Sequence, residues 1–271
     1  MKYIMALASL LLLSTSTLAC QLIDPASIDA TEAERDIFDQ MSSVPEWLNA
    51  QAQHTTLSGR TLTVSSQKDI QLADGEVILT FDDGPGKQIT ERILTILQTY
   101  KVHATFFMVG NMVDSNPAAA RLVAQQGNSV GSHTYCHPDL ATIEHQNALT
   151  EIKQAEASII RTTNLAAVAF FRFPFLSTTP ELQQDLDRRG VIVIPADIDT
   201  EDYKDVPPAE IVDLAMKQLE SKRKGIILMH DIFHRSVDAL PLLLTKLNNS
   251  KFKVVNLQPS TALIGRLSHT P

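Results

Sequence analysis

Residues 76–85 read EVILTFDDGP, and the fold and the chemistry predicted for the chain both start from this stretch. Its first six residues form an apolar run with β-branched and aromatic side chains, which indicates a buried strand. Gly84-Pro85 ends that strand, so Asp82 and Asp83 stand where a strand stops and a loop begins. In parallel α/β folds, ligands bind at this end of the strands. An ordinary solvated turn is the alternative, because Asp, Gly and Pro are common turn residues.

The two neighbouring carboxylates also indicate a candidate metal-binding or proton-transfer site. Adjacent acidic side chains are costly to place together unless a cation or a proton separates their roles. One Asp of the pair could therefore bind a metal ion while the other acts as a base. The choice between such a site and a plain turn depends on the residues downstream.

The composition is that of an ordinary globular domain. The chain has 271 residues, of which 44% are apolar and 20% are charged. This is enough for one large core, and an α/β barrel of this length forms a single domain. The formal charge of -8 argues against a nucleic-acid partner and against a polybasic membrane-binding surface. The oligomeric state is left open.

Residues 1–19 have the pattern of a secretory signal peptide. Lys2 precedes an apolar run at residues 3–13, and small residues follow up to Cys20. The run is too short to span a bilayer as a permanent helix. Residues 17–20 also resemble a bacterial lipoprotein box, in which Cys20 would carry lipid and provide the only membrane attachment; plain secretion is the alternative. We expect an exported protein, periplasmic, in the cell envelope or secreted.

The rest of the chain is predicted to be an extension followed by one domain. Residues 20–74 form the extension, with a helix over 31–41 and a short edge strand over 61–64. From residue 75 to 265, apolar runs alternate with segments of helical period, which predicts a parallel α/β sheet closed, or nearly closed, into a barrel. The seven strand-like runs are 76–82, 104–110, 128–134, 167–174, 191–199, 225–231 and 251–257, and the helical stripes between them begin at Ile89, Ala148, Ile211 and Val237.

Polar residues interrupt this pattern where the apolar runs end, and two of them are histidines that follow the third run. His133 and His137 are four residues apart, so both side chains reach one cation if the stretch makes a helical turn. The same spacing also arises by chance. Between them lies Cys136, which is expected to be a lone, small, buried thiol if Cys20 carries lipid.

Further polar residues stand at the ends of later runs. Arg172 lies in an apolar stretch, where a guanidinium needs a carboxylate partner unless it points into solvent. The fifth run ends in several acids, among them Asp199 and Asp202, which alternatively make a solvated loop or a helix cap. His230 ends the sixth run, where a lone His is more often a satisfied core residue.

Together these stretches resemble the NodB-type polysaccharide deacetylases, carbohydrate esterase family four, over residues 75–265. That family has five ordered motifs, and the counterparts here are Thr80–Pro85, His133–His137, Arg172–Phe175, Asp199–Tyr203 and Ile227–His230. The resemblance implies a distorted (β/α)7 barrel and an exported, metal-dependent hydrolase. Its substrate would be an N-acetylated glycan (peptidoglycan, a chitin-type chain or poly-N-acetylglucosamine), from which it would release acetate.

The resemblance also implies a role for each matched residue. Asp83, His133 and His137 would bind one divalent cation, with Zn²⁺ expected first and Co²⁺ or Ni²⁺ as alternatives. Asp82 would be the general base that activates water, oriented by Arg172. His230 would be the acid that protonates the leaving amine, and Asp202 would hold His230 in place. The backbone N–H of Phe175 would stabilise the oxyanion, and Tyr203 would form a wall of the substrate site.

The chain departs from the family pattern at two positions. Phe175 replaces the usual Tyr of the third motif, and Tyr203 replaces the usual Trp of the fourth. The first change leaves the backbone donor in place, and the second affects the fit of the sugar. Two other functions stay open: an O-acetyl (xylan) esterase that uses the same site, and a catalytically silent glycan-binding module. The second is disfavoured because no metal ligand, base or acid is missing.

Overall fold

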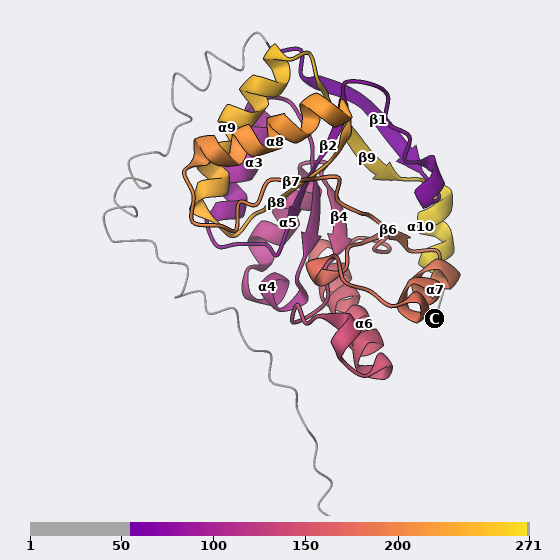
Figure 1. Ribbon diagram of the computed structural model, residues 1–271. Helices are drawn as coiled ribbons and strands as arrows, with labels where there is room; N and C mark the ends of the chain where they lie inside the picture. The colour runs from indigo at the N-terminus through magenta and orange to yellow at the C-terminus, as the bar shows by residue number, and fades with distance from the viewer. Residues whose placement is uncertain (1–54, 270–271) are drawn as a thin grey trace, which may run out of the picture.

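The computed structural model describes residues 55–269. The predicted signal peptide, the candidate lipid site at Cys20 and the helix predicted over 31–41 lie outside the described residues, so they stay predictions. The described part is a parallel sheet with helices on its outer surface (Figure 1). In this part of the chain, no helix is both long enough and apolar enough to cross a membrane.

Seven short strands form the barrel, and every pairing between them is parallel. β2 lies in the middle, between β3 on one side and β8 on the other. Among the described residues no ladder joins β6 to β7, so the barrel is open at that seam. The strands are β2 (Glu76–Asp82), β3 (Thr105–Met108), β4 (Ser129–Ser132), β5 (Phe170–Phe171), β6 (Ile192–Val193), β7 (Ile198–Asp199) and β8 (Gly225–His230).

Two predicted strands differ from the structure. The run 191–199 is not one strand, because it divides into β6 and β7 around Pro195, which has no N–H for a ladder. The last run, predicted at 251–257, is observed as β9 (Lys253–Pro259) and pairs with β2 only near Glu76. β9 pairs instead with β1 (Ser58–Val64), which lies at the edge of the sheet. The predicted edge strand is therefore confirmed.

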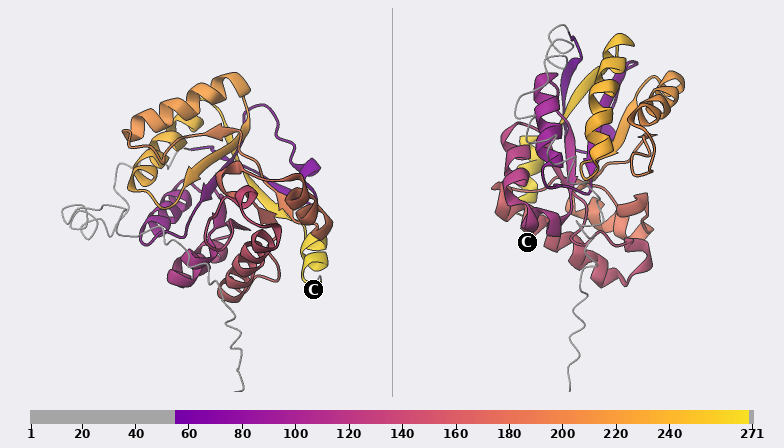
Figure 2. Two further views of the ribbon diagram at one scale, coloured as in Figure 1. Left: turned by 60° about the horizontal axis from the view of Figure 1, so that its bottom comes forward. Right: turned by 90° about the vertical axis from the view of Figure 1, so that its left-hand side faces the viewer.

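Eight α-helices among the described residues surround the sheet, as the two further views show (Figure 2). Their apolar stripes face the strands: Ile93 of α3, Ile152 of α6, Ala215 of α8 and Leu244 of α9 are fully buried. The predicted helical stripes are therefore confirmed. The helices are α3 (Ile89–Thr99), α4 (Gly110–Ser115), α5 (Pro117–Gln125), α6 (His145–Thr163), α7 (Pro180–Arg189), α8 (Pro208–Lys222), α9 (His234–Asn249) and α10 (Thr261–Leu267), with 3-10 turns η1 (Gln67–Asp69), η2 (Leu140–Thr142) and η3 (Pro174–Leu176).

Candidate metal and catalytic site

The predicted site residues meet at one end of the barrel. Asp82 is the last residue of β2, His133 follows β4, Arg172 follows β5, and His230 is the last residue of β8. Asp82 and His230 are also direct register partners across the β2–β8 ladder. Because parallel strands present their carboxyl ends at the same edge, residues that are far apart in the chain converge here.

Asp83, His133 and His137 form a compact set of candidate metal ligands. One ligand atom from each of the three lies within 4.8 Å of the others. Asp83 Oδ1 is 3.5 Å from His133 Nε2 and 3.2 Å from His137 Nε2, and the two Nε2 atoms are 3.2 Å apart. The structure therefore brings together the three residues that the sequence motifs single out.

The two histidines do not converge through a helical turn, so that part of the prediction is wrong. Residues 133–137 form an irregular turn in which Thr134 and His137 have φ angles of 69° and 58°. These left-handed residues interrupt helical geometry and fold the chain back on itself. The Thr134 hydroxyl accepts a hydrogen bond from the His137 N–H at 3.0 Å. The side chains reach one point because the backbone turns between them.

The chemistry of this set fits a divalent cation. Asp83 Oδ1 is buried and has no hydrogen-bond partner in the described part of the chain, although it faces both imidazoles. His133 Nδ1 donates a hydrogen bond to the Arg172 carbonyl at 2.7 Å, which leaves Nε2 with a lone pair directed at the set. Burial holds the pKa of His133 well below its ordinary value, so the imidazole is neutral, as a metal ligand must be.

Asp82 is placed to act as a base beside this set. Its Oδ1 accepts a hydrogen bond from Arg172 at 2.7 Å, and its Oδ2 lies 3.8 Å from His133 Nε2. One carboxylate oxygen is thus held by the guanidinium while the other faces the candidate cation. Burial raises the pKa of Asp82 to about 6, although the positive charge of Arg172 opposes this. A carboxylate with a pKa in this range is a better proton acceptor than an exposed Asp.

Arg172 is fully buried and makes contacts along its whole guanidinium. Besides Asp82, it donates to Thr80 Oγ1 at 2.7 Å, and the group stacks over the Phe107 ring at 4.2 Å. It also donates to the carbonyls of Ile194 at 3.1 Å and Pro195 at 2.8 Å. These carbonyls are available because the strand breaks there. The alternative in which Arg172 points into solvent is wrong.

His230, beside Asp82 at the end of the neighbouring strand β8, is paired with a fully buried carboxylate. Asp202 Oδ1 accepts the His230 Nδ1–H at 2.6 Å, and Asp202 Oδ2 accepts the His230 backbone N–H at 2.8 Å. The hydroxyl of Ser236 donates to the same Oδ2 at 2.5 Å. His230 Nε2 lies 4.0 Å from Asp83 Oδ2, so it faces the site. Burial lowers the pKa of His230, but the charge and hydrogen bond of Asp202 outweigh it and raise the value to about 10.

This pairing predicts a change in the pH profile when Asp202 is replaced by Asn. The acid predicted from the motifs is His230 carrying its proton, and the raised pKa keeps that proton bound up to high pH. Asp202→Asn removes the negative charge while keeping a side-chain oxygen for Nδ1–H, so the pKa of His230 should fall and activity should be lost at lower pH. We expect the alkaline limb of the kcat/KM profile to move down by at least about one pH unit. An alkaline limb at the same pH in both proteins would contradict the assignment of His230 as the acid.

Exposed aromatic side chains border the site on two sides. Phe175 is 68% exposed, and its ring centre lies 4.8 Å from that of His137. Tyr203 is 48% exposed, and its ring meets His230 edge-on at 5.9 Å, with Phe233 at 5.8 Å on the same imidazole. Both residues predicted to contact substrate therefore lie beside the metal and acid groups. Exposed rings next to catalytic groups are suited to stacking on a sugar.

Three features of the site were not anticipated from sequence. Asp231 is almost completely buried, accepts a hydrogen bond from Thr90 at 2.6 Å, and packs so closely against Gly84 that any side chain at Gly84 would collide with its carboxyl group. Burial raises the pKa of Asp231 to about 7. Its position directly after His230, at a strand end, is a signal that could have identified it. The contact of Ser236 with Asp202 has no such local signal. Cys136 is half-buried and is not a free thiol, so the expectation of a lone, buried thiol is wrong.

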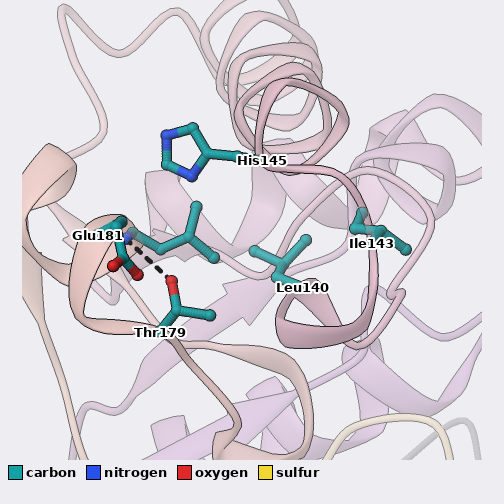
Figure 3. A pocket seen from close by; sticks show the side chains of 6 residues that line it. Leu140, Ile143, His145, Thr179 and Glu181 are labelled. Atoms are coloured by element: carbon teal, nitrogen blue, oxygen red, sulfur yellow. Dashed lines mark hydrogen bonds between the residues drawn. The ribbon is translucent and has the colours of Figure 1, made fainter.

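A separate cavity of about 260 Å³ lies between the start of α6 and the start of α7 (Figure 3). Its apolar floor is edged by His145 and Glu181, and His145 Nε2 is 2.7 Å from Asp185. None of the predicted site residues lines it. The lining residues are Leu140, Ile143, His145, Thr179, Glu181 and Leu182.

Comparison with known proteins agrees with this geometry. Residues 69–194 match the family model described as polysaccharide deacetylase. That segment contains Asp82 and the three candidate metal ligands but ends before Asp202 and His230. The acid side of the site therefore lies beyond the matched segment, and the structure places it.

Two relatives illustrate the similarity. The peptidoglycan-N-acetylmuramic acid deacetylase PdaC of Bacillus subtilis is 34% identical over 67% of this chain, which spans only 38% of that protein's length. A solved structure of PdaC has a TM-score of 0.62 and 31% identity, and the match covers 73% of this chain and 93% of the chain in that structure. A chitin deacetylase of Colletotrichum lindemuthianum is 34% identical, with 61% of this chain and 71% of the relative covered.

The similar structures also include a relative described as inactive. It is a pseudoenzyme of carbohydrate esterase family four from Bacillus anthracis, with 27% identity and a TM-score of 0.63, and the match covers 73% of this chain and 70% of that one. Turnover must therefore be argued from the residues of the site itself. The fold, the matched motifs and the identity to relatives agree on the classification. The chain belongs to the polysaccharide deacetylase family.

Proposed function

We propose that this protein is a metal-dependent N-deacetylase that hydrolyses the acetamide groups of an N-acetylated glycan and releases acetate. The observation that carries the proposal is that a candidate base and a candidate acid both lie within about 4 Å of one candidate metal set. Asp82 Oδ2 lies 3.8 Å from His133 Nε2, and His230 Nε2 lies 4.0 Å from Asp83 Oδ2. This arrangement suits hydrolysis of an amide, which needs proton removal from water and proton delivery to nitrogen.

We assign one residue of the site to each step. A divalent cation, for which we propose Zn²⁺, would polarise the acetyl carbonyl and lower the pKa of water at the site. Asp82 Oδ2 takes a proton from the attacking water, while Arg172 holds Oδ1 and keeps the carboxylate oriented. As the oxygen of water bonds to the carbonyl carbon, the backbone N–H of Phe175 stabilises the negative charge on the carbonyl oxygen. His230 Nε2–H then protonates the amine nitrogen, the C–N bond breaks, and acetate and a free amino sugar remain.

Two considerations point to the class of substrate: the acetamide group that the reaction requires, and the exposed aromatic side chains that border the site. The exposed rings of Phe175 and Tyr203 are suited to stacking on the faces of neighbouring sugars, which supports a glycan as substrate. Peptidoglycan, chitin-type chains and poly-N-acetylglucosamine all present the required group. The names of the relatives support this range, since they act on peptidoglycan and chitin.

The test is release of acetate by the purified protein, with a chelator and with Zn²⁺ added back. The substrates are chito-oligosaccharides, peptidoglycan, poly-N-acetylglucosamine and acetylated xylan. We expect release from at least one of the three amide glycans, loss of release with chelator and recovery with Zn²⁺. Release from xylan alone would replace the proposal with an O-acetyl esterase. No release from any glycan by protein shown to bind Zn²⁺ would favour a silent glycan-binding module.

A further inference from the structure

The turn between the two histidine ligands has a conformation that its own residues do not favour. Thr134 is β-branched and yet has a φ of 69°, and His137 has a φ of 58°. Non-glycine residues adopt such angles only where the surroundings hold them in place. The position of His137 relative to His133 therefore depends on contacts from outside the turn.

Glu151 of α6 supplies two of these contacts with a single oxygen. Its Oε2 accepts the backbone N–H of Tyr135 at 3.0 Å and that of Cys136 at 2.7 Å. These residues lie between the two left-handed positions, so the carboxylate holds the middle of the turn.

The opposite side of the turn is held by the start of α4. The N–H of Gly110 donates to the Thr134 carbonyl at 2.9 Å, and the N–H of Asn111 donates to the Tyr135 carbonyl at 3.0 Å. A side chain at Gly110 would collide with the Tyr135 ring, so α4 lies directly against the turn. The backbone of residues 134–136 is therefore clamped between α4 and Glu151.

The helix that carries Glu151 is itself fixed. Ala148, Ile152 and Ala155 of α6 are fully buried, and α4 packs against α6. Rotation of the helix would expose this stripe, so the direction of the neighbouring Glu151 side chain is set by the core. Its carboxylate is half-buried between the helix and the turn.

We propose that Glu151 is a positioning residue that sets the affinity of the Asp83, His133 and His137 site for its cation. The inference rests on the metal site of the proposed function and deepens it. Glu151 acts through the backbone of the turn, by holding His137 where its Nε2 meets His133 and Asp83. The reach of the side chain to both N–H groups is what matters in this role, more than its charge.

Two substitutions separate reach from charge. Glu151→Asp keeps the charge but shortens the side chain by one methylene, so the carboxylate cannot reach both N–H groups. Glu151→Gln keeps the length and one oxygen that can accept both bonds, but it loses the charge. Loss of a group that orients a metal ligand typically weakens binding 10- to 100-fold. We expect Glu151→Asp to weaken Zn²⁺ binding by at least about 10-fold, and Glu151→Gln to weaken it clearly less.

The experiment is a Zn²⁺ titration of the full chain in competition with a chromophoric chelator, which needs no turnover. The matched control is Glu156→Asp, because Glu156 lies on the same helix but pairs with Arg189 at 2.5 Å. This control should bind Zn²⁺ like the parent. Parent-like binding by Glu151→Asp would overturn the inference, and so would a Glu151→Gln protein that binds as weakly as Glu151→Asp or more weakly. A parent protein that binds no Zn²⁺ would instead overturn the metal site of the proposed function, and the inference with it.

Discussion

Replacing Asp82 by Asn is expected to lower kcat/KM by at least about 100-fold while Zn²⁺ stays bound, since a general base typically contributes 10²- to 10⁴-fold. The amide cannot take a proton from water, but its oxygen still accepts the hydrogen bond that Arg172 now gives to Asp82 Oδ1 at 2.7 Å. Asp83, His133 and His137 are unchanged. The measurement is the initial rate of acetate release, together with a Zn²⁺ titration of the same protein.

The matched control for this substitution is Asp139→Asn. Asp139 lies two residues after His137, and its side chain caps the 3-10 turn η2 by accepting the Ala141 N–H at 3.1 Å. Asn caps helical turns as well as Asp does, so activity should be retained. If Asp82→Asn matched the parent in rate, Asp82 would not be the base and the mechanism would fail.

Replacing Arg172 by Ala is expected to lower the free energy of unfolding by about 3–5 kcal/mol, the range seen when one partner of a buried ion pair is removed. Asp82 would remain buried without its cationic partner, and the carbonyls of Ile194 and Pro195 would lose their donor. The Phe107 ring would also lose the guanidinium that covers it. The measurement is urea unfolding followed by circular dichroism in the presence of a chelator.

Two further variants make this result specific. Arg188→Ala removes an exposed guanidinium from a pair with Asp185 and should leave the free energy of unfolding nearly unchanged. Adding Asp82→Asn to Arg172→Ala should recover part of the lost stability, because the unpaired buried charge is then gone. An Arg172→Ala protein as stable as the parent would show that the buried pair does not contribute to holding this end of the barrel.

Local patterns predicted the parts of the fold and site that local chemistry determines. The run ending at Asp82 is a buried strand, the stripe containing Ile152 faces the core, and Arg172 meets a carboxylate as its burial requires. The polar exceptions at strand ends predicted where the site would be. The roles of individual residues came from the family resemblance, because a motif carries chemistry that spacing alone does not.

Features that depend on contacts between distant segments could not be predicted in the same way. The irregular turn at Thr134 depends on Glu151, and a spacing of four residues fits a helix equally well. Pro195 is a local signal for the break in the run 191–199, but the use of the Ile194 and Pro195 carbonyls by the distant Arg172 is not. Asp231 is next to a predicted site residue, but its fit against Gly84 exists only in three dimensions.

The order in which the barrel strands occur in the chain has a consequence for folding. β2 pairs with β8 over six registered residues, although the five strands β3 to β7 lie between them in sequence. During synthesis, β2 therefore emerges long before the partner that covers its edge, and the proposed base and the candidate metal ligands are complete before the proposed acid. Such non-local parallel pairing is slow to form, and an uncovered edge can pair with another chain in the meantime. A chain that stops before β8 would carry the whole candidate metal set, lack the proposed proton donor and present a hydrophobic strand prone to aggregation.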